Sequence, residues 1–217
     1  AMAGTYALAV VVGLYLVYVG GLPIVLVGLS SIAAGVAYTG GPYPYGYRGL
    51  GDLFVFVYFG LVAVMGTYYV QAAATLPWVD PLALGIPAGT VTIEAFVVSL
   101  PAAGLSTAIL VVNNIRDRET DAATGKKTLA VMLGYLWSRV EWLAMVGMAY
   151  VVPVLFALDA EFGLPALLPL VTLPLAVSLG RTVLTRTDGE ALNPALERTG
   201  QLLAAHSALF AIGLALT

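Results

Sequence analysis

Long apolar segments follow one another along the whole chain, and they constrain its fold more than any other feature. Seven of them lie at about residues 4–19, 22–38, 53–76, 90–115, 129–158, 164–184 and 196–216. A helix needs about 20 apolar residues to cross a hydrocarbon layer of about 30 Å, whereas membrane β-barrels show alternating segments of about ten residues. The sequence therefore predicts an all-α integral membrane protein, with residues 1–217 forming a single domain of seven spans.

The composition agrees with this class and excludes others. Hydrophobic residues make up 60% of the chain and charged residues 10%, and the mean hydropathy is +0.96. The sequence contains no cysteine, so disulfide and thiolate chemistry is excluded. The net charge of −3 gives no basic surface of the kind that binds nucleic acid, and no nucleic-acid partner is expected.

The distribution of basic residues predicts the topology. Threading seven spans alternately places loops 39–52, 116–128 and 185–195 on one side of the membrane. These loops, with the span ends that face them, hold all nine lysines and arginines. Because cytoplasmic loops are enriched in Lys and Arg, we expect a multi-pass protein of the cytoplasmic membrane with these three loops in the cytoplasm.

A polar sequence, NNIRDRETD at residues 113–121, runs directly off the fourth apolar segment. Asn113, Asp117 and Asp121 are spaced by four, so in a helix they share one face with a slight drift. Two carboxylates and an amide oxygen form half of a coordination shell for a hard cation, which indicates Mg²⁺. A solvated loop that only sets the orientation of the chain is the simpler interpretation, but it requires neither the spacing of four nor the paired amides.

Basic residues accompany this acidic pattern. Arg116 and Arg118 lie within it, and Lys126 and Lys127 follow shortly after. Guanidinium and ammonium groups bind phosphate oxygens. Acids, amides and bases at a cytoplasmic membrane face therefore predict a metal–diphosphate site.

Two other classes of membrane protein compete with this interpretation. A small-molecule transporter would show charged residues near the bilayer midplane and repeated halves with interrupted helices. In this sequence the basic residues and the acidic motif collect at one face, and the two halves show no duplication. A phosphatidyltransferase also uses acidic Mg²⁺ sites, but the sequence contains no D-x2-D-G run.

The same residues resemble a known family. Residues 113–121, followed by ATGKKTLAV at 123–131, resemble the second aspartate-rich motif of the UbiA superfamily of intramembrane prenyltransferases. The doubled asparagine and the GKKTLA sequence are most similar to its MenA branch, the 1,4-dihydroxy-2-naphthoate polyprenyltransferases. YTGGP at 38–42 with YRGLGD at 47–52 is similar to another cytoplasmic loop of that branch, and LNP at 192–194 matches its C-terminal region. The resemblance covers essentially the whole chain.

This resemblance implies a reaction. A polyprenyl chain would pass from polyprenyl diphosphate to 1,4-dihydroxy-2-naphthoate with Mg²⁺ as cofactor and loss of the ring carboxylate, giving demethylmenaquinol for menaquinone biosynthesis. The implied partners are polyprenyl diphosphate, an aromatic acceptor and the surrounding membrane lipid. Other acceptors of the superfamily, namely 4-hydroxybenzoate, a chlorin, haem or a glycerol-phosphate lipid, remain alternatives.

The resemblance also implies roles for individual residues. Asp117 and Asp121 would bind Mg²⁺, with Asn113 as a ligand or beside the ligands. The diphosphate would be held by Arg116, Lys127 and Lys126.

Polar residues before and within the third apolar segment are further candidates for substrate binding. Arg48 and Asp52 either anchor the start of this segment and complement its dipole, or cover the site, with Arg48 near the diphosphate and Asp52 orienting the aromatic acceptor. Gln71 and Tyr68 lie deep in the segment or near its far end, where helix packing is the alternative to substrate contact. Gln71 is the better candidate of the two, because an amide inside the membrane needs a partner.

One part of the family pattern is not found in this sequence. The superfamily has nine helices and a first N-x3-D-x3-D motif between its second and third helices, and the seven spans correspond to the third through ninth. We therefore expect the complete molecule to carry two further N-terminal helices, whose acids face Asp117 across a central cavity. Without them we expect no activity.

Overall fold

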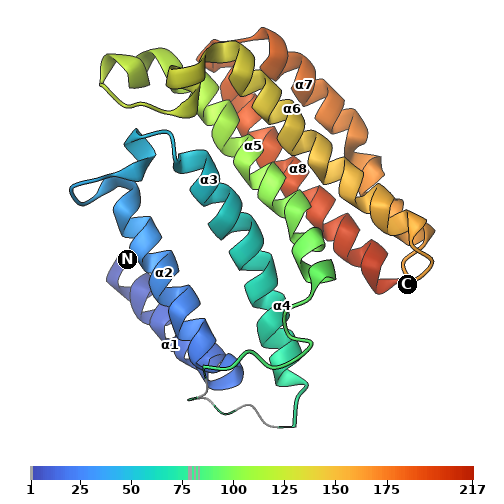
Figure 1. Cartoon of the computed structure of the whole chain (residues 1–217). Coiled ribbons are helices and arrows are strands. Elements are labelled where there is room, and N and C mark those ends of the chain that lie inside the picture. The colour runs from blue at the N-terminus through green and yellow to red at the C-terminus, as the bar shows by residue number, and fades with distance from the viewer. Residues whose placement is uncertain (1, 78–79, 81, 83) are drawn as a thin grey trace.

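The computed structural model describes residues 2–77, 80, 82 and 84–217, and this part of the chain contains helices and no strand (Figure 1). The elements are α1 (Met2–Gly20), α2 (Leu22–Thr39), the 3-10 turn η1 (Tyr45–Tyr47), α3 (Gly51–Val55), the π-helix η2 (Phe56–Val62), α4 (Ala63–Ala74), α5 (Ile93–Ala123), α6 (Leu129–Leu158), the 3-10 helix η3 (Leu164–Thr172), α7 (Leu173–Thr185) and α8 (Gly189–Ala215). Because α3, η2 and α4 form one rod and η3 continues into α7, these elements make seven helical rods. The all-helical prediction is confirmed.

The helices have the length and composition of membrane spans. Five helices of the described part of the chain are long and apolar enough to cross a membrane: Leu22–Thr39, Gly51–Ala74, Ile93–Ala123, Leu129–Leu158 and Leu164–Thr185. The apolar part of α1, Leu8–Gly20, is shorter, and α8 is not among these five. Large apolar side chains such as Leu14 and Leu136 are exposed on the outer faces, where lipid rather than water would meet them. The chain is an integral membrane protein.

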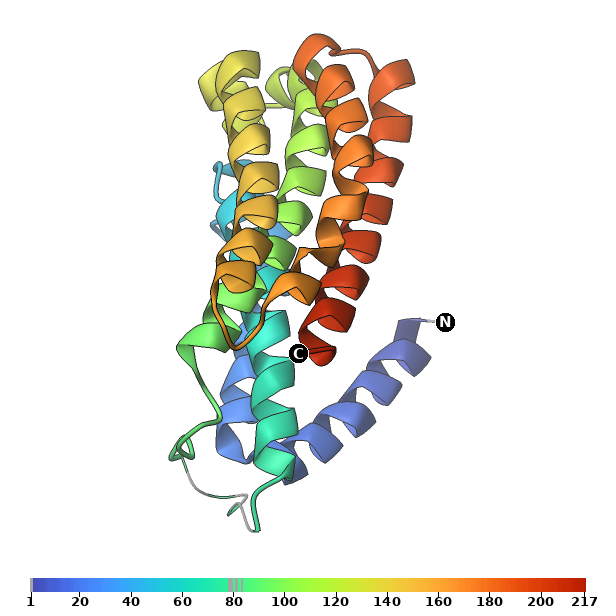
Figure 2. The ribbon, with the colours of Figure 1, turned by 90° about the vertical axis from the view of Figure 1, so that its right-hand side faces the viewer.

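The longest described helix, α5, lies at the centre of the bundle. It packs against α6 and α8 on one side and against the α3–η2–α4 rod on the other (Figure 1). Its buried face, which includes Leu105, Val112 and Ile115, contacts Trp142 of α6 and Leu179 of α7 in the main core. By contrast, α1 and α2 stand on the outer side of the α3–η2–α4 rod, and α1 leans away from the bundle (Figure 2).

Two helix boundaries differ from the sequence-based expectation. The polar residues 116–123, predicted as part of a loop, are the last turns of α5, and α8 begins at Gly189 rather than near residue 196. The loops are therefore shorter than predicted, at 124–128 and 186–188. A helix can continue past the membrane boundary because its polar side chains then face water.

The start of α8 is fixed by a cap. The Asp188 carboxylate accepts a hydrogen bond from the Ala191 N–H at 3.0 Å and another from Arg186 Nε at 2.7 Å. The contact with Arg186 lowers the pKa of Asp188 to about 2, so the capping carboxylate is ionised at neutral pH and complements the helix dipole.

Glycine allows the α3–η2–α4 rod to approach α5 closely. A Cβ atom added at Gly60 of η2 would overlap the backbone and side chain of Ala103. On the opposite side of α5, a Cβ atom at Gly104 would overlap the carbonyl group of Met145 in α6. Close backbone approach at small residues is the usual way in which helices associate in membranes.

We predict that Gly60→Ala destabilises the fold by about 1–3 kcal/mol, because the added methyl group overpacks this crossing. Gly66→Ala is the matched control, since a Cβ atom at Gly66 of the same rod meets nothing within 4 Å and both changes bring the same gain in helix propensity. The measurement is the thermal unfolding midpoint in detergent, and equal midpoints for the two variants would contradict the proposed crossing.

Candidate functional site

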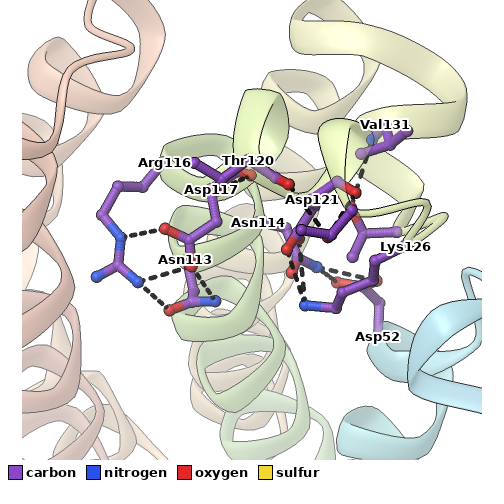
Figure 3. Close-up of polar contacts among 11 residues, drawn as sticks. Asp52, Asn113, Asn114, Arg116, Asp117, Thr120, Asp121, Lys126 and Val131 are labelled. Atoms are coloured by element: carbon purple, nitrogen blue, oxygen red, sulfur yellow. Dashed lines mark hydrogen bonds and ion pairs between the residues drawn. The ribbon is translucent and has the colours of Figure 1, made fainter.

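One side of the polar end of α5 carries a closed hydrogen-bonded group. Arg116 Nε and Nη2 donate to the two carboxylate oxygens of Asp117 at 2.7 and 2.8 Å. Arg116 Nη2 also donates to Asn113 Oδ1 at 2.8 Å, and Asn113 Nδ2 donates to Asp117 Oδ2 at 3.3 Å. Figure 3 shows these three side chains facing one another. The Arg116 guanidinium thus pairs with Asp117 through two parallel contacts, the geometry that favours strong ion pairs.

The second carboxylate of the motif has a different basic partner. Lys126 Nζ donates to both carboxylate oxygens of Asp121, at 3.1 and 3.3 Å. The backbone N–H of Lys126 also donates to the Asp121 carbonyl oxygen at 2.9 Å. The turn that ends α5 therefore folds Lys126 back onto the side chain it neutralises.

A third group joins α5 to the start of α3. Asn114 Nδ2 lies 3.3 and 3.4 Å from the two carboxylate oxygens of Asp52 (Figure 3). Both side chains are buried, with 5% and 4% exposure. The backbone N–H of Lys127 donates to the Tyr47 carbonyl oxygen at 3.1 Å, so two of the loops that the sequence predicts on the same side of the membrane are in contact.

Helix geometry explains why the motif divides in this way. At about 100° per residue, Asn113 and Asp117 differ by about 40° around the axis, whereas Asn114 and Asp121 differ by only about 20°. The first pair faces the side on which Arg116 lies, and the second pair faces the side of α3 and Lys126 (Figure 3). Asp117 and Asp121 are therefore neighbours on successive turns, each drawn toward its own basic partner.

The site can supply part of a magnesium shell. Carboxylate and amide oxygens are suitable donors for Mg²⁺, and the Asp117 side chain remains 32% exposed. Within residues 2–77, 80, 82 and 84–217, no group of three or more His, Cys, Asp or Glu converges in the way a complete metal site would. The donor set fits a cation that keeps water or substrate oxygens as its other ligands.

Of the remaining predicted residues, two lie at the polar end of the bundle and two lie far from it. Arg48 is exposed, with its guanidinium carbon 4.0 Å from the centre of the Tyr43 ring. The Lys127 residue is also exposed, on the turn that follows α5. Both belong to the polar end of the bundle and could reach a ligand bound there.

By contrast, Gln71 and Tyr68 are not brought to this end. They line a cavity of about 860 Å³ together with Glu94 and Glu161, and Tyr68 Oη donates to the Gly89 carbonyl oxygen at 3.3 Å. Sixteen residues of nearly continuous helix separate Asp52 from Tyr68, which corresponds to about 24 Å. We call the three hydrogen-bonded groups at the polar end of α5 the ionic site; its charged residues are Asp52, Arg116, Asp117, Asp121 and Lys126. The structure therefore separates Gln71 and Tyr68 from the ionic site.

An apolar cavity of about 570 Å³ lies beside α3. It is lined by small residues of α2, including Ala34 and Gly35, and by Tyr45, Phe54 and Tyr58. The rings of Tyr45 and Phe54 stack with their centres 3.8 Å apart. This cavity borders Gly51, the residue next to Asp52, and it can accommodate an apolar or aromatic group.

Two residues of the site carried no assigned role in the sequence analysis. They are Asn114, which holds Asp52, and Asn193, whose Oδ1 accepts a hydrogen bond from Arg116 Nη1 at 3.0 Å. The paired asparagine and the LNP sequence indicated these positions. Their partners could not be predicted, because Asp52 and Arg116 are 62 and 77 residues away in the chain.

Fold and site together define a multi-span membrane protein with an ionic site at one end of its central helix. The chain belongs to the UbiA prenyltransferase family, whose family model matches residues 1–211. The predicted resemblance is thereby confirmed.

Curated relatives give finer comparisons. The 1,4-dihydroxy-2-naphthoate octaprenyltransferase of Escherichia coli (strain K12) is 38% identical over 194 residues, which cover 89% of this chain and 58% of that protein. The protein of the same name from Mycobacterium tuberculosis is 37% identical over 194 residues, 89% of this chain and 60% of the relative. Human UbiA prenyltransferase domain-containing protein 1 is 31% identical over 177 residues, 82% of this chain and 46% of the relative. The chain thus spans 46–60% of the length of these relatives.

We predict that Asn114 and Asp52 stabilise the fold as a pair. In a double-mutant cycle with Asn114→Ala and Asp52→Ala, the coupling in the free energy of unfolding should be about 0.5–3 kcal/mol. The single change Asn114→Ala should be the more harmful one, because it leaves a buried carboxylate without its amide donor. Additive effects would show that the two side chains do not interact.

Proposed function

We propose that the protein transfers a polyprenyl chain from polyprenyl diphosphate to 1,4-dihydroxy-2-naphthoate, with loss of the ring carboxylate, in menaquinone synthesis. One observation carries the proposal: each of the two carboxylates of the α5 motif lies against a basic side chain. The chain that holds them has relatives at 37–38% identity that are named 1,4-dihydroxy-2-naphthoate octaprenyltransferase. Acids that can hold a metal, beside bases that can hold phosphate, suit the departure of a diphosphate.

The leaving group sets the chemical task. When the allylic C–O bond of the donor ionises, negative charge develops on the diphosphate and a delocalised carbocation remains. The electron-rich ring of the acceptor attacks this cation. Bound Mg²⁺, held by Asp117 and Asp121 with the Asn113 amide beside them, would supply charge neutralisation at the leaving diphosphate.

The basic residues of the chain complete this environment. Arg116 and Lys126 each pair with one of the two carboxylates, and both are cations that could bind a diphosphate. Lys127 and Arg48 are both exposed at the same end. They would supply further cationic contacts to the diphosphate. Preorganised charges of this kind stabilise the developing negative charge without rearrangement during the reaction.

The acceptor and the prenyl chain need different surroundings. The aromatic cavity beside α3, with Tyr45, Phe54 and Tyr58 in its wall, is suited to an apolar substrate part that should not cross water. Asp52, which Asn114 holds beside Gly51 of this cavity, would orient the hydroxyl groups of a naphthoate ring. We assign Gln71 and Tyr68 no part in binding at this end.

We propose that the ionic site faces the cytoplasm, because the basic residues gather at this end of the bundle. The turn after α5 and the one before α8 are both at the upper end in Figure 1. The chain lacks cysteine, so single cysteines can report the orientation.

The labelling experiment compares Thr187→Cys, in the turn before α8, with Ala160→Cys, in the turn after α6, both at exposed positions. In intact spheroplasts a membrane-impermeant maleimide should label Ala160→Cys alone, and Thr187→Cys should react only after permeabilisation. The reverse pattern would place the ionic site outside.

We predict that Asp117→Asn and Asp121→Asn each lower kcat by about 10²–10³-fold, the scale of losing one major electrostatic stabiliser. Release of diphosphate and formation of prenylated naphthoquinol are measured with the full-length protein in detergent, octaprenyl diphosphate and Mg²⁺. Asp159→Asn, a carboxylate at the opposite end of α6, is the matched control and should retain wild-type turnover. Wild-type turnover in both motif variants would refute the assignment, and solute uptake without prenyl transfer would favour a transporter.

A further inference from the structure

Asn193 connects α8 with the ionic site on α5. It lies in the second turn of α8, and its Oδ1 accepts a hydrogen bond from Arg116 Nη1 at 3.0 Å. The other two nitrogens of the same guanidinium donate to Asp117 and Asn113, both on α5. One side chain of α8 therefore fixes the single nitrogen of Arg116 that α5 does not engage.

The first turns of α8 are held in a defined position beside Arg116. Asp188 caps the helix and is itself bound by Arg186. A Cβ atom added at Gly189 would lie 4.0 Å from Arg116 Cγ and 3.9 Å from Asn193 Nδ2, so the backbone at this point forms a wall next to the arginine. The side chain of Leu192, the residue before Asn193, is fully buried in the main core. Asn193 is thus presented from a rigid element.

The chemical nature of the contact is informative. An aspartate at this position would neutralise Arg116 and compete with Asp117 for it. The neutral amide accepts a hydrogen bond and leaves the positive charge available to an anionic ligand. Arg116 remains 23% exposed and Asp117 32% exposed, so a ligand can reach both side chains.

We propose that Asn193 is a positioning residue that keeps the Arg116 guanidinium at the site when its donors turn from Asp117 to the diphosphate of the substrate. The inference rests on the proposed function. With Asp117 engaged by a metal ion, the two contacts from Arg116 to Asp117 weaken, and the amides of Asn193 and Asn113 are the neutral groups that hold the arginine. Less of its side-chain freedom is then lost on binding, which favours the diphosphate complex.

The test uses the full-length protein in detergent with octaprenyl diphosphate. Asn193→Ala should raise KM for this donor about tenfold, with kcat within about twofold of wild type and an unchanged thermal midpoint. Asn193→Gln, which keeps a carbonyl acceptor, should recover part of the loss. Gln201→Ala is the matched control, because Gln201 is an exposed amide of the same helix whose described side-chain contact is with Glu197 alone.

A second measurement separates positioning from general damage. Mn²⁺ binding, followed by electron paramagnetic resonance without any prenyl diphosphate, reports on the carboxylates directly. Asn193→Asp should lower the Kd for Mn²⁺, because the introduced carboxylate draws Arg116 away from Asp117, and it should raise KM for octaprenyl diphosphate further than Asn193→Ala does. Opposite shifts for the metal and the donor are not expected from a loosened fold.

Two results would overturn the proposal. One is a wild-type KM in Asn193→Ala while Asp117→Asn still lowers kcat by about 10²–10³-fold. That result would refute the role of Asn193 and leave the proposed function intact. The other is a parallel loss of thermal midpoint, kcat and Mn²⁺ binding in all Asn193 variants, which would make the contact purely structural. Wild-type turnover in both Asp117→Asn and Asp121→Asn would instead remove the proposed function itself.

Discussion

The exclusion of charge from the membrane interior is the constraint on which the rest of this structure depends. A membrane helix satisfies its backbone internally, but an ionised side chain in its middle costs several kcal/mol. In α5 the apolar part is buried by α6, α8 and the α3–η2–α4 rod, and the basic residues and paired acids all follow Asn113. The same constraint that makes α5 the core of the bundle therefore concentrates its chemistry in the last turns.

Two acids close together at one helix end repel each other, and in this structure each acid is paired with a base. Asp117 and Asp121 lie on successive turns and would repel each other if both were left without cations. Arg116 neutralises the first and Lys126 the second. Each acid thus has a cationic partner without a ligand, and both pairs are partly exposed, so exchange with a metal ion and a phosphate is feasible.

Length and hydropathy were enough to predict the helical rods, because a membrane restricts a chain to few solutions. The boundaries near residues 116 and 196 were wrong, because polarity was interpreted as a loop although a helix can continue into water. The spacing of Asn113, Asp117 and Asp121 indicated the site. Its division into two groups could not be predicted, because it depends on Lys126 folding back across a turn and on Asp52 and Asn193 arriving from other helices. The expected first motif and the proposed residue roles stay predictions.

The chain contains three asparagines, at positions 113, 114 and 193, and each one contacts a charged side chain of the ionic site. Asn113 touches Arg116 and Asp117, Asn114 holds Asp52, and Asn193 holds Arg116. A neutral amide can fix the direction of an ion by a hydrogen bond without cancelling its charge. In a site that must keep both acids for a metal and bases for a phosphate, amides are the residues that can position each ion and still leave it free to act.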